Sequence, residues 1–216
     1  KISGAVEMTG HVERKQGVTD GELSISGSNL KIRDLVVQQL RVQSSIAKNV
    51  VHLNEGSATL NQTDFLDAKG TLGLQAPYDY NGKVAARIAN LAVMEPLLRA
   101  FGSQTQLAGS LQLDWDGNGQ GVTASEPSTK SAAAQAAAPW KNNGNLKLVL
   151  EKGRYGNMQK VHANVDASYS PEGLDVPTIS FTTDNMDFQA SARAKGNRIE
   201  IDKLKLDQGQ AKFASG

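Results

Sequence analysis

The seven residues KVAARIA, which run from position 83 to position 89, decide the fold class of this chain. Val84, Ala86 and Ile88 fall on one side of an extended backbone, while a lysine, an alanine and an arginine fall on the other. A side-chain period of two is the period of a β-strand. The stretch therefore predicts a strand with one apolar face and one face in water.

The same alternation recurs on both sides of this stretch, which predicts a mainly β protein built on one long antiparallel sheet with an apolar face. Turn residues separate the predicted strands: YNG at 80–82, DGNGQG at 116–121, SPEG at 170–173 and KGN at 195–197. The candidate residues of the apolar face are Leu23, Ile25, Leu72, Leu74, Val84, Ala86, Ile88, Leu111, Leu113, Leu146, Leu148, Val165, Phe181, Phe188, Ile199 and Ile201.

A weak internal repeat of the form G-x-L-x-[I/L] begins at Gly21, Gly70, Gly109 and Gly144. The copies are unevenly spaced, whereas the coils of a β-helix keep a tight period. The repeat therefore favours an antiparallel sheet with loops of variable length.

Residues 91–102, LAVMEPLLRAFG, have helical spacing instead of strand spacing. Met94, Leu97, Leu98 and Phe101 recur at three- and four-residue intervals, which places them on one face of a helix. A helix of two or three turns is not stable alone in water. We therefore expect this apolar helix face to pack on the apolar face, or on one open end, of the sheet.

The boundaries of this helix follow from its proline and its glycine. Pro96 is tolerated only in the first turn, where its missing N–H has no partner in any case. The helix is therefore predicted to begin near Met94 or Glu95 and to end at Phe101, with Gly102 as a left-handed cap.

Composition excludes several classes of protein. The chain of 216 residues carries 23 Lys and Arg against 22 Asp and Glu, with the two signs interleaved, so a basic footprint for nucleic acid is absent. It contains no cysteine, which excludes disulfides and thiolate metal sites. No run of about 18 apolar residues is present to span a bilayer.

The chain is expected to form a single sheet in three parts. Residues 1–119 form a β-segment that includes the helix, 120–139 form a flexible low-complexity loop, and 140–216 continue the same sheet. The chain begins without methionine and stops just after a predicted strand. We therefore expect it to be a fragment whose membrane anchor lies outside it.

We find no catalytic or metal-binding constellation. His11, His52 and His162 are far apart in sequence and have no second ligand or nucleophile at a recognisable spacing. The alternating acidic residues of DWDGNGQG, at 114–121, suggest calcium, but the twelfth position of such a loop would be Ser125 and not glutamate. A hairpin turn is the simpler interpretation, and we expect no enzyme, cofactor or metal.

The stretch NLAVMEPLLRAFGSQTQLAGSLQLDWDGNGQG, at 90–121, resembles the AsmA-like, or TamB-like, family of bacterial envelope proteins. In that family a strand is followed by a short helix L-x-x-L-x-P-L-L, a glycine, a few polar residues, then L-x-G-x-L-x-L and a glycine-rich turn. The matching positions here are Leu91, Met94, Pro96, Leu97, Leu98, Gly102, Leu107, Gly109, Leu111 and Leu113.

The resemblance implies a long, curved, taco-like β-groove with an apolar concave face and a polar convex face. It implies a location in the periplasm, an inner-membrane anchor, and transfer of phospholipid or another acyl lipid towards the outer membrane. The short helix, through Met94, Leu97, Leu98 and Phe101, would then cap part of the groove.

Two other functions stay open at this point. Sheet edges can template strands of outer-membrane proteins by β-augmentation, which would make the chain an assembly scaffold with outer-membrane assembly proteins as partners. A surface adhesin built as a β-solenoid is the third possibility, and it would have a closed interior without lipid.

Overall fold

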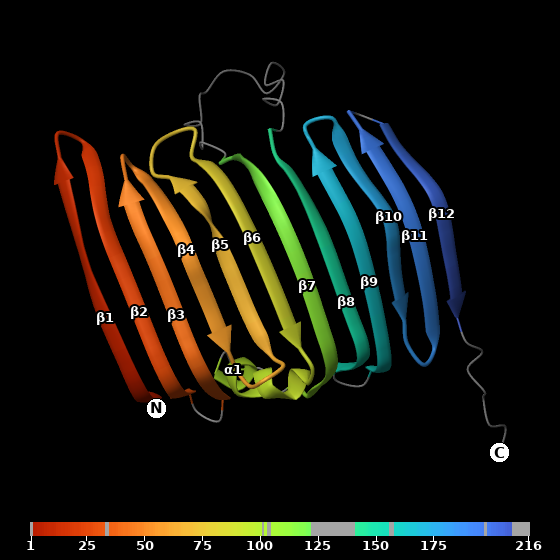
Figure 1. The fold of residues 1–216 in the computed structure, drawn as a ribbon. Coiled ribbons are helices and arrows are strands. Elements are labelled where there is room, and N and C mark those ends of the chain that lie inside the picture. The colour runs from red at the N-terminus through yellow and green to blue at the C-terminus, as the bar shows by residue number, and fades with distance from the viewer. Residues whose placement is uncertain are drawn as a thin grey trace.

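The computed structural model describes residues 2–32, 35–100, 102, 105–121, 141–155, 158–196 and 198–208. In this part of the chain the fold is one open antiparallel sheet in which every strand pairs with its neighbours in sequence (Figure 1). The strands are β1 (Ile2–Lys15), β2 (Val18–Ile32), β3 (Leu35–Ala47), β4 (Val50–Thr59), β5 (Phe65–Gly73), β6 (Asp79–Ile88), β7 (Leu107–Gln120), β8 (Asn143–Tyr155), β9 (Met158–Ser170), β10 (Gly173–Thr182), β11 (Met186–Lys195) and β12 (Arg198–Gln208). The predicted mainly β, antiparallel fold is confirmed.

The register of the strands aligns the apolar positions into rows that run across the sheet. One row, which we call the central apolar row, crosses all twelve strands and contains no polar side chain. Its members are Val6, Gly27, Leu40, Ala58, Leu66, Ala86, Leu113, Leu148, Val165, Ile179, Ala190 and Leu204. Residues at period two from this row share its side of the sheet, which we call the apolar face; where a β-bulge shifts the period, the cross-strand partner assigns the side, as at Ile199 and Ile201.

The sheet continues across residues 122–140, which lie outside the described residues, because β7 pairs directly with β8. The register couples Leu113 to Leu148 and Trp115 to Leu146. Strands on both sides of the low-complexity segment therefore belong to one sheet.

Two of the four predicted turns are wrong. YNG at 80–82 lies inside β6, and DGNGQG at 116–121 lies almost wholly inside β7. The true connection before β6 is 74–78, so Leu74 lies in a turn and not on the strand that was predicted to carry it. The predicted turns at 170–173 and 195–197 are confirmed by the β9–β10 and β11–β12 registers and by the turns at 171–172 and 196.

The predicted helix is present, and it is preceded by a short 3₁₀ turn. η1 (Leu91–Met94) begins at Asn90, whose side chain accepts a hydrogen bond from the Ala92 amide at 3.1 Å, and α1 (Glu95–Ala100) follows directly. Pro96 is the second residue of α1, as a first-turn proline requires. The side chain of Leu97 and all of Phe101 lie outside the described residues.

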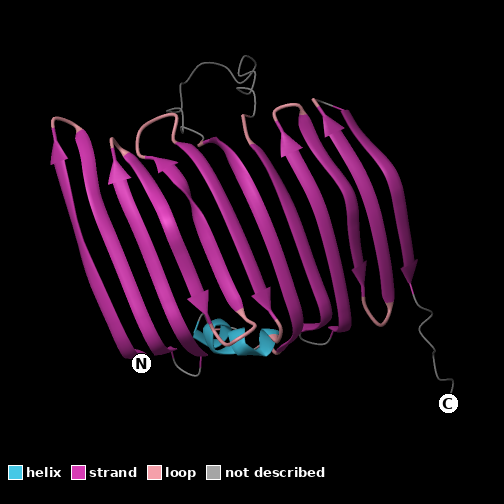
Figure 2. Cartoon of the chain, viewed as in Figure 1, coloured by secondary structure: helices cyan, strands magenta, loops and turns pink. Residues whose placement is uncertain are grey.

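The helical segment lies at the end of the sheet where β6 stops and β7 starts (Figure 2). η1 contacts β7, and the Glu95 carboxylate accepts a hydrogen bond from the Leu107 amide at 2.9 Å. The segment is therefore fixed to the first residue of the strand that follows it.

We expect Gly102→Ala to lower the free energy of unfolding by about 1 kcal/mol, because Gly102 has a φ of +85° and nothing lies within 4 Å of an added Cβ. The cost is then backbone strain alone. Urea unfolding followed by circular dichroism measures it. Gly102→Asn should cost less, since asparagine tolerates this conformation, and an equal cost for both variants would contradict the explanation.

Candidate functional site: the apolar face of the sheet

The apolar face gathers all but one of the candidate residues predicted from the sequence. Cross-strand partners lie on the same side of a sheet, and the pairings connect β2 to β12 through these positions. The candidates on this face are Leu23, Ile25, Leu72, Val84, Ala86, Ile88, Leu111, Leu113, Leu146, Leu148, Val165, Phe181, Phe188, Ile199 and Ile201. Leu74 is the exception, for the reason given above.

The apolar face is not covered by a second layer of strands in the described part of the chain. Its side chains are mostly half-buried by one another, and they are most exposed at the two edges: Met8 on β1 is 69% exposed and Ile199 on β12 is 74% exposed. Ala86 and Ile88 are only 3% and 8% exposed, so these two candidates are packed inside and offer little surface to a ligand.

An aromatic cluster on this face, formed by Tyr80, Trp115 and Tyr169, was not recognised from the sequence as a unit. The Trp115 indole Nε1–H donates a hydrogen bond to the Tyr169 hydroxyl at 3.2 Å. Burial raises the pKa of Tyr80 above its ordinary value of 10.0, and the nearby Tyr169 raises it further through its charge and a hydrogen bond. Three strands thus contribute polar hydrogens to an otherwise apolar surface.

Glycines make room for these rings. A Cβ added to Gly82 would lie 3.0 Å from the Trp115 ring, and one added to Gly117 would lie 2.5 Å from the Tyr169 hydroxyl. Gly82 pairs with Gly117, and Gly117 pairs with Gly144, so the three form a strip across β6, β7 and β8. Gly82 and Gly117, which were predicted as turn residues, are therefore strand residues that lie beneath aromatic side chains.

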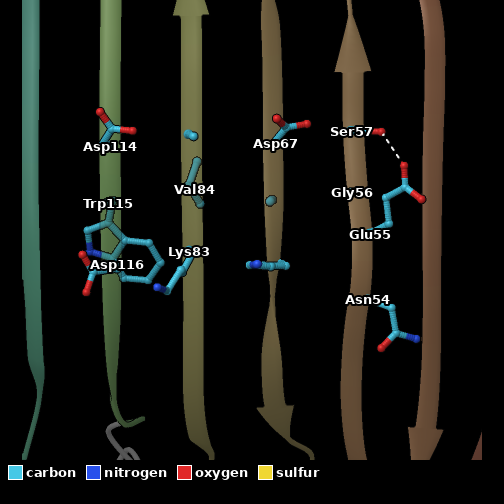
Figure 3. Close-up of a pocket in the computed structure, with 13 residues that line it drawn as sticks. Asn54, Glu55, Gly56, Ser57, Asp67, Lys83, Val84, Asp114, Trp115 and Asp116 are labelled. Atoms are coloured by element: carbon cyan, nitrogen blue, oxygen red, sulfur yellow. Dashed lines mark hydrogen bonds between the residues drawn. The ribbon is translucent and has the colours of Figure 1, made fainter.

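Several hollows over the described residues lie on the opposite, polar face. One of them, with a volume of about 480 Å³, lies over β4 to β7. Figure 3 shows the residues that line it. Asp67 and Asp114 line one side of it, and Lys83 and Asp116 line the other. Charged walls do not suit an acyl chain, so the groove that the resemblance implies on the apolar face stays a prediction.

Arg87 ties β6 to β7 on the polar face. Its guanidinium donates to both oxygens of Asp114, at 2.9 and 3.1 Å, and to the carbonyl of Leu113 at 3.2 Å. The hydrogen bonding from Arg87 to the carboxylate is the main reason that the pKa of Asp114 lies below its ordinary value of 3.8. The alternating Asp114 and Asp116 that suggested calcium are thus strand residues: Asp114 pairs with Arg87, and Asp116 accepts from Asn145 at 3.3 Å.

We expect Asp114→Asn to lower the free energy of unfolding at neutral pH by at most about 1 kcal/mol, because the pair is partly exposed. The folded-state pKa is depressed, so this stability is present above pH 3.8 and is lost as the pH falls through the lower, folded-state value. Urea titrations of both proteins from neutral to acidic pH should converge at the acid end. A difference that persisted there would contradict the assignment.

The described residues contain no cluster of three His, Cys, Asp or Glu side chains that would hold a metal ion. Among the helices of this part of the chain, none has the length and apolar character needed to cross a membrane. Comparison of the sequence and the fold with known proteins found no matching family model, no matching curated protein and no matching solved structure.

Proposed function

We propose that the apolar face binds the acyl chains of phospholipids and that the chain is a segment of a periplasmic protein that moves lipid between two membranes. The central apolar row is the observation that supports this most directly: it crosses twelve strands without a polar side chain and without a covering layer in the described residues. Folded monomers seldom leave so large an apolar surface without a ligand or partner.

The dimensions of the face fit an acyl chain. From Tyr80 to Ile88 a strand advances about 26 Å at roughly 3.3 Å per residue, and one leaflet of a bilayer is about 15 Å of hydrocarbon. The polar face, with its ion pairs and mixed charges, would stay in water while hydrocarbon covers the apolar face. The periplasmic location and the inner-membrane anchor rest on the resemblance to AsmA-like proteins alone.

Native mass spectrometry of the chain, purified from bacterial cells without detergent, tests this proposal. We expect phospholipid masses on the folded protein, and we expect the delipidated protein to take phospholipid up again from vesicles. A lipid-free protein that takes up none, with its apolar face buried in a dimer or oligomer, would overturn the proposal.

A scaffold for outer-membrane protein assembly is the second candidate, and the sheet edges favour it. β1 and β12 end the strand order and do not pair with each other, and the described side chains of β12 are exposed along its whole length. Such edges accept an added strand. Proline substitutions in β12 should abolish client pairing at that edge if this function holds, while lipid uptake in the middle of the apolar face, on β6 to β9, should be unchanged. The third possibility, a β-solenoid, does not match the open antiparallel sheet.

A further inference from the structure

The middle of the apolar face changes its chemistry along the strand direction. Towards η1 and α1 the paired residues of β6, β7 and β8 are Ile88, Leu111 and Leu150, all aliphatic. Towards the other end the same strands carry Tyr80, Trp115 and the glycine strip. An amphipathic gradient of this kind, with aliphatic side chains at one end and aromatic hydrogen-bond donors at the other, also marks the boundary between hydrocarbon and headgroups in membranes.

The polar end of this gradient is formed by three aromatic side chains. Tyr80, Trp115 and Tyr169 are each half-buried and together carry two hydroxyls and an indole N–H, which we call the aromatic rim. Asn142 lies beside it: its Oδ1 accepts a hydrogen bond from the Gln120 amide at 3.0 Å, and the same side chain stands where a Cβ on Gly119 would be.

The aromatic rim differs from the rest of the apolar face in what it can recognise. Along the central apolar row no side chain can donate a hydrogen bond, so that row cannot orient an amphiphile. The Trp115 N–H already donates to the Tyr169 hydroxyl. Tyrosine hydroxyls can donate to ester and phosphate oxygens, while their rings remain in contact with hydrocarbon. The rim is therefore suited to the glycerol end of a phospholipid.

We infer that a phospholipid on this face lies along the strands, with its ester and phosphate oxygens at Tyr80, Trp115 and Tyr169 and its acyl ends towards η1 and α1. The inference rests on the proposed function and adds an orientation to it. About 13 Å of strand separates the row of Val84 from the row of Ile88, which is close to the hydrocarbon length of one leaflet. Lipid lying across the strands, along the apolar rows, is the competing arrangement.

Fluorescence quenching of Trp115 tests the orientation. The chain has two tryptophans, so Trp140→Phe leaves Trp115 as the single reporter. The probe is phosphatidylcholine brominated either on acyl carbons near the glycerol or on carbons near the methyl end, and bound lipid is counted separately by extraction. We expect the glycerol-proximal bromines to quench several-fold more strongly.

The outcomes separate the two claims. Bound lipid with equal quenching by both probes, or with stronger quenching by the methyl-end bromines, overturns the inference and leaves the proposed function intact. Absence of bound lipid overturns both. Tyr80→Phe with Tyr169→Phe should flatten the quenching difference at a similar lipid content, because the rings remain and the hydroxyl donors are lost, while the control Tyr78→Phe, in the turn before β6, should leave it unchanged.

Discussion

Replacement of Asp64 by alanine is expected to lower the free energy of unfolding by about 3 kcal/mol, because the side chain is a buried carboxylate that accepts several hydrogen bonds. Asp64 is 1% exposed, in the connection between β4 and β5. Its carboxylate accepts hydrogen bonds from the backbone N–H of Ala89 at 2.7 Å, from the side-chain Nδ2 of Asn61 at 2.8 Å and from the Thr63 hydroxyl at 3.1 Å. Urea unfolding of both proteins measures the loss.

The contact with Ala89 explains why the effect should be large. Ala89 directly follows β6 and precedes η1, so Asp64 connects the β4–β5 turn to the start of the helical segment. Alanine would leave the Ala89 amide and the Asn61 side chain without this acceptor, at contacts that are partly shielded from water.

A reciprocal exchange provides the control. In the unchanged chain the Asn61 side-chain amide faces the Asp64 carboxylate. In the Asp64→Asn variant it faces a second amide instead. Asn61→Asp combined with Asp64→Asn restores one carboxylate and one amide, and we expect it to recover a large part of the lost stability. If the double variant is no more stable than Asp64→Asn, the hydrogen-bond explanation is wrong.

Val84→Gln combined with Leu148→Gln is expected to weaken phospholipid binding on the order of 30-fold. Both side chains lie half-buried on the apolar face, on β6 and β8. Loss of half of the transfer free energy of two aliphatic side chains amounts to about 2 kcal/mol, and each 1.4 kcal/mol is about tenfold in affinity. Titration of the delipidated protein with a fluorescent phospholipid gives the affinity.

The matched control moves each substitution by one residue. Ala85→Gln with Val149→Gln changes the same two strands, but these residues pair with Asp67 and Gln112 on the polar face. We expect this variant to bind phospholipid as the unchanged chain does. Equal weakening in both variants would mean that the apolar face is not where the lipid lies.

The sequence predicts the sides of the strands better than their ends. The alternation at Val84, Ala86 and Ile88 is expected when one face of a strand is shielded from water. In the structure these three residues lie on the apolar face of β6. The helix boundaries were predictable for the same kind of reason, because Pro96 and Gly102 restrict the backbone locally.

The two wrong turn predictions arise because glycine is common in turns and also occurs in strands where a neighbouring side chain leaves no room for a Cβ. Gly82 and Gly117 are common turn residues, but here they lie within strands because the Trp115 ring occupies the space above them. That space depends on the pairing of β6 with β7, which no local pattern specifies. The aromatic cluster escaped sequence analysis for the same reason, since Tyr80 and Tyr169 are 89 positions apart and meet only through the register.

The buried carboxylate of Asp64 was likewise hidden in a polar stretch, LNQTD, that reads as an ordinary solvated turn. Its partners include the amide of Ala89, which is distant in sequence. Only the tertiary fold shows that this turn is hydrogen-bonded to Ala89, the residue that directly follows β6.

Photo-crosslinking along β8 tests whether phospholipid lies on the apolar face. A photoreactive phenylalanine analogue is placed singly at each position from Leu146 to Leu150, and the protein is irradiated with bound phospholipid. We expect lipid adducts at Leu146, Leu148 and Leu150 and none at Lys147 and Val149, because alternate residues of β8 face opposite sides of the sheet. Adducts at all five positions, or at none of them in a protein that carries lipid, would contradict it.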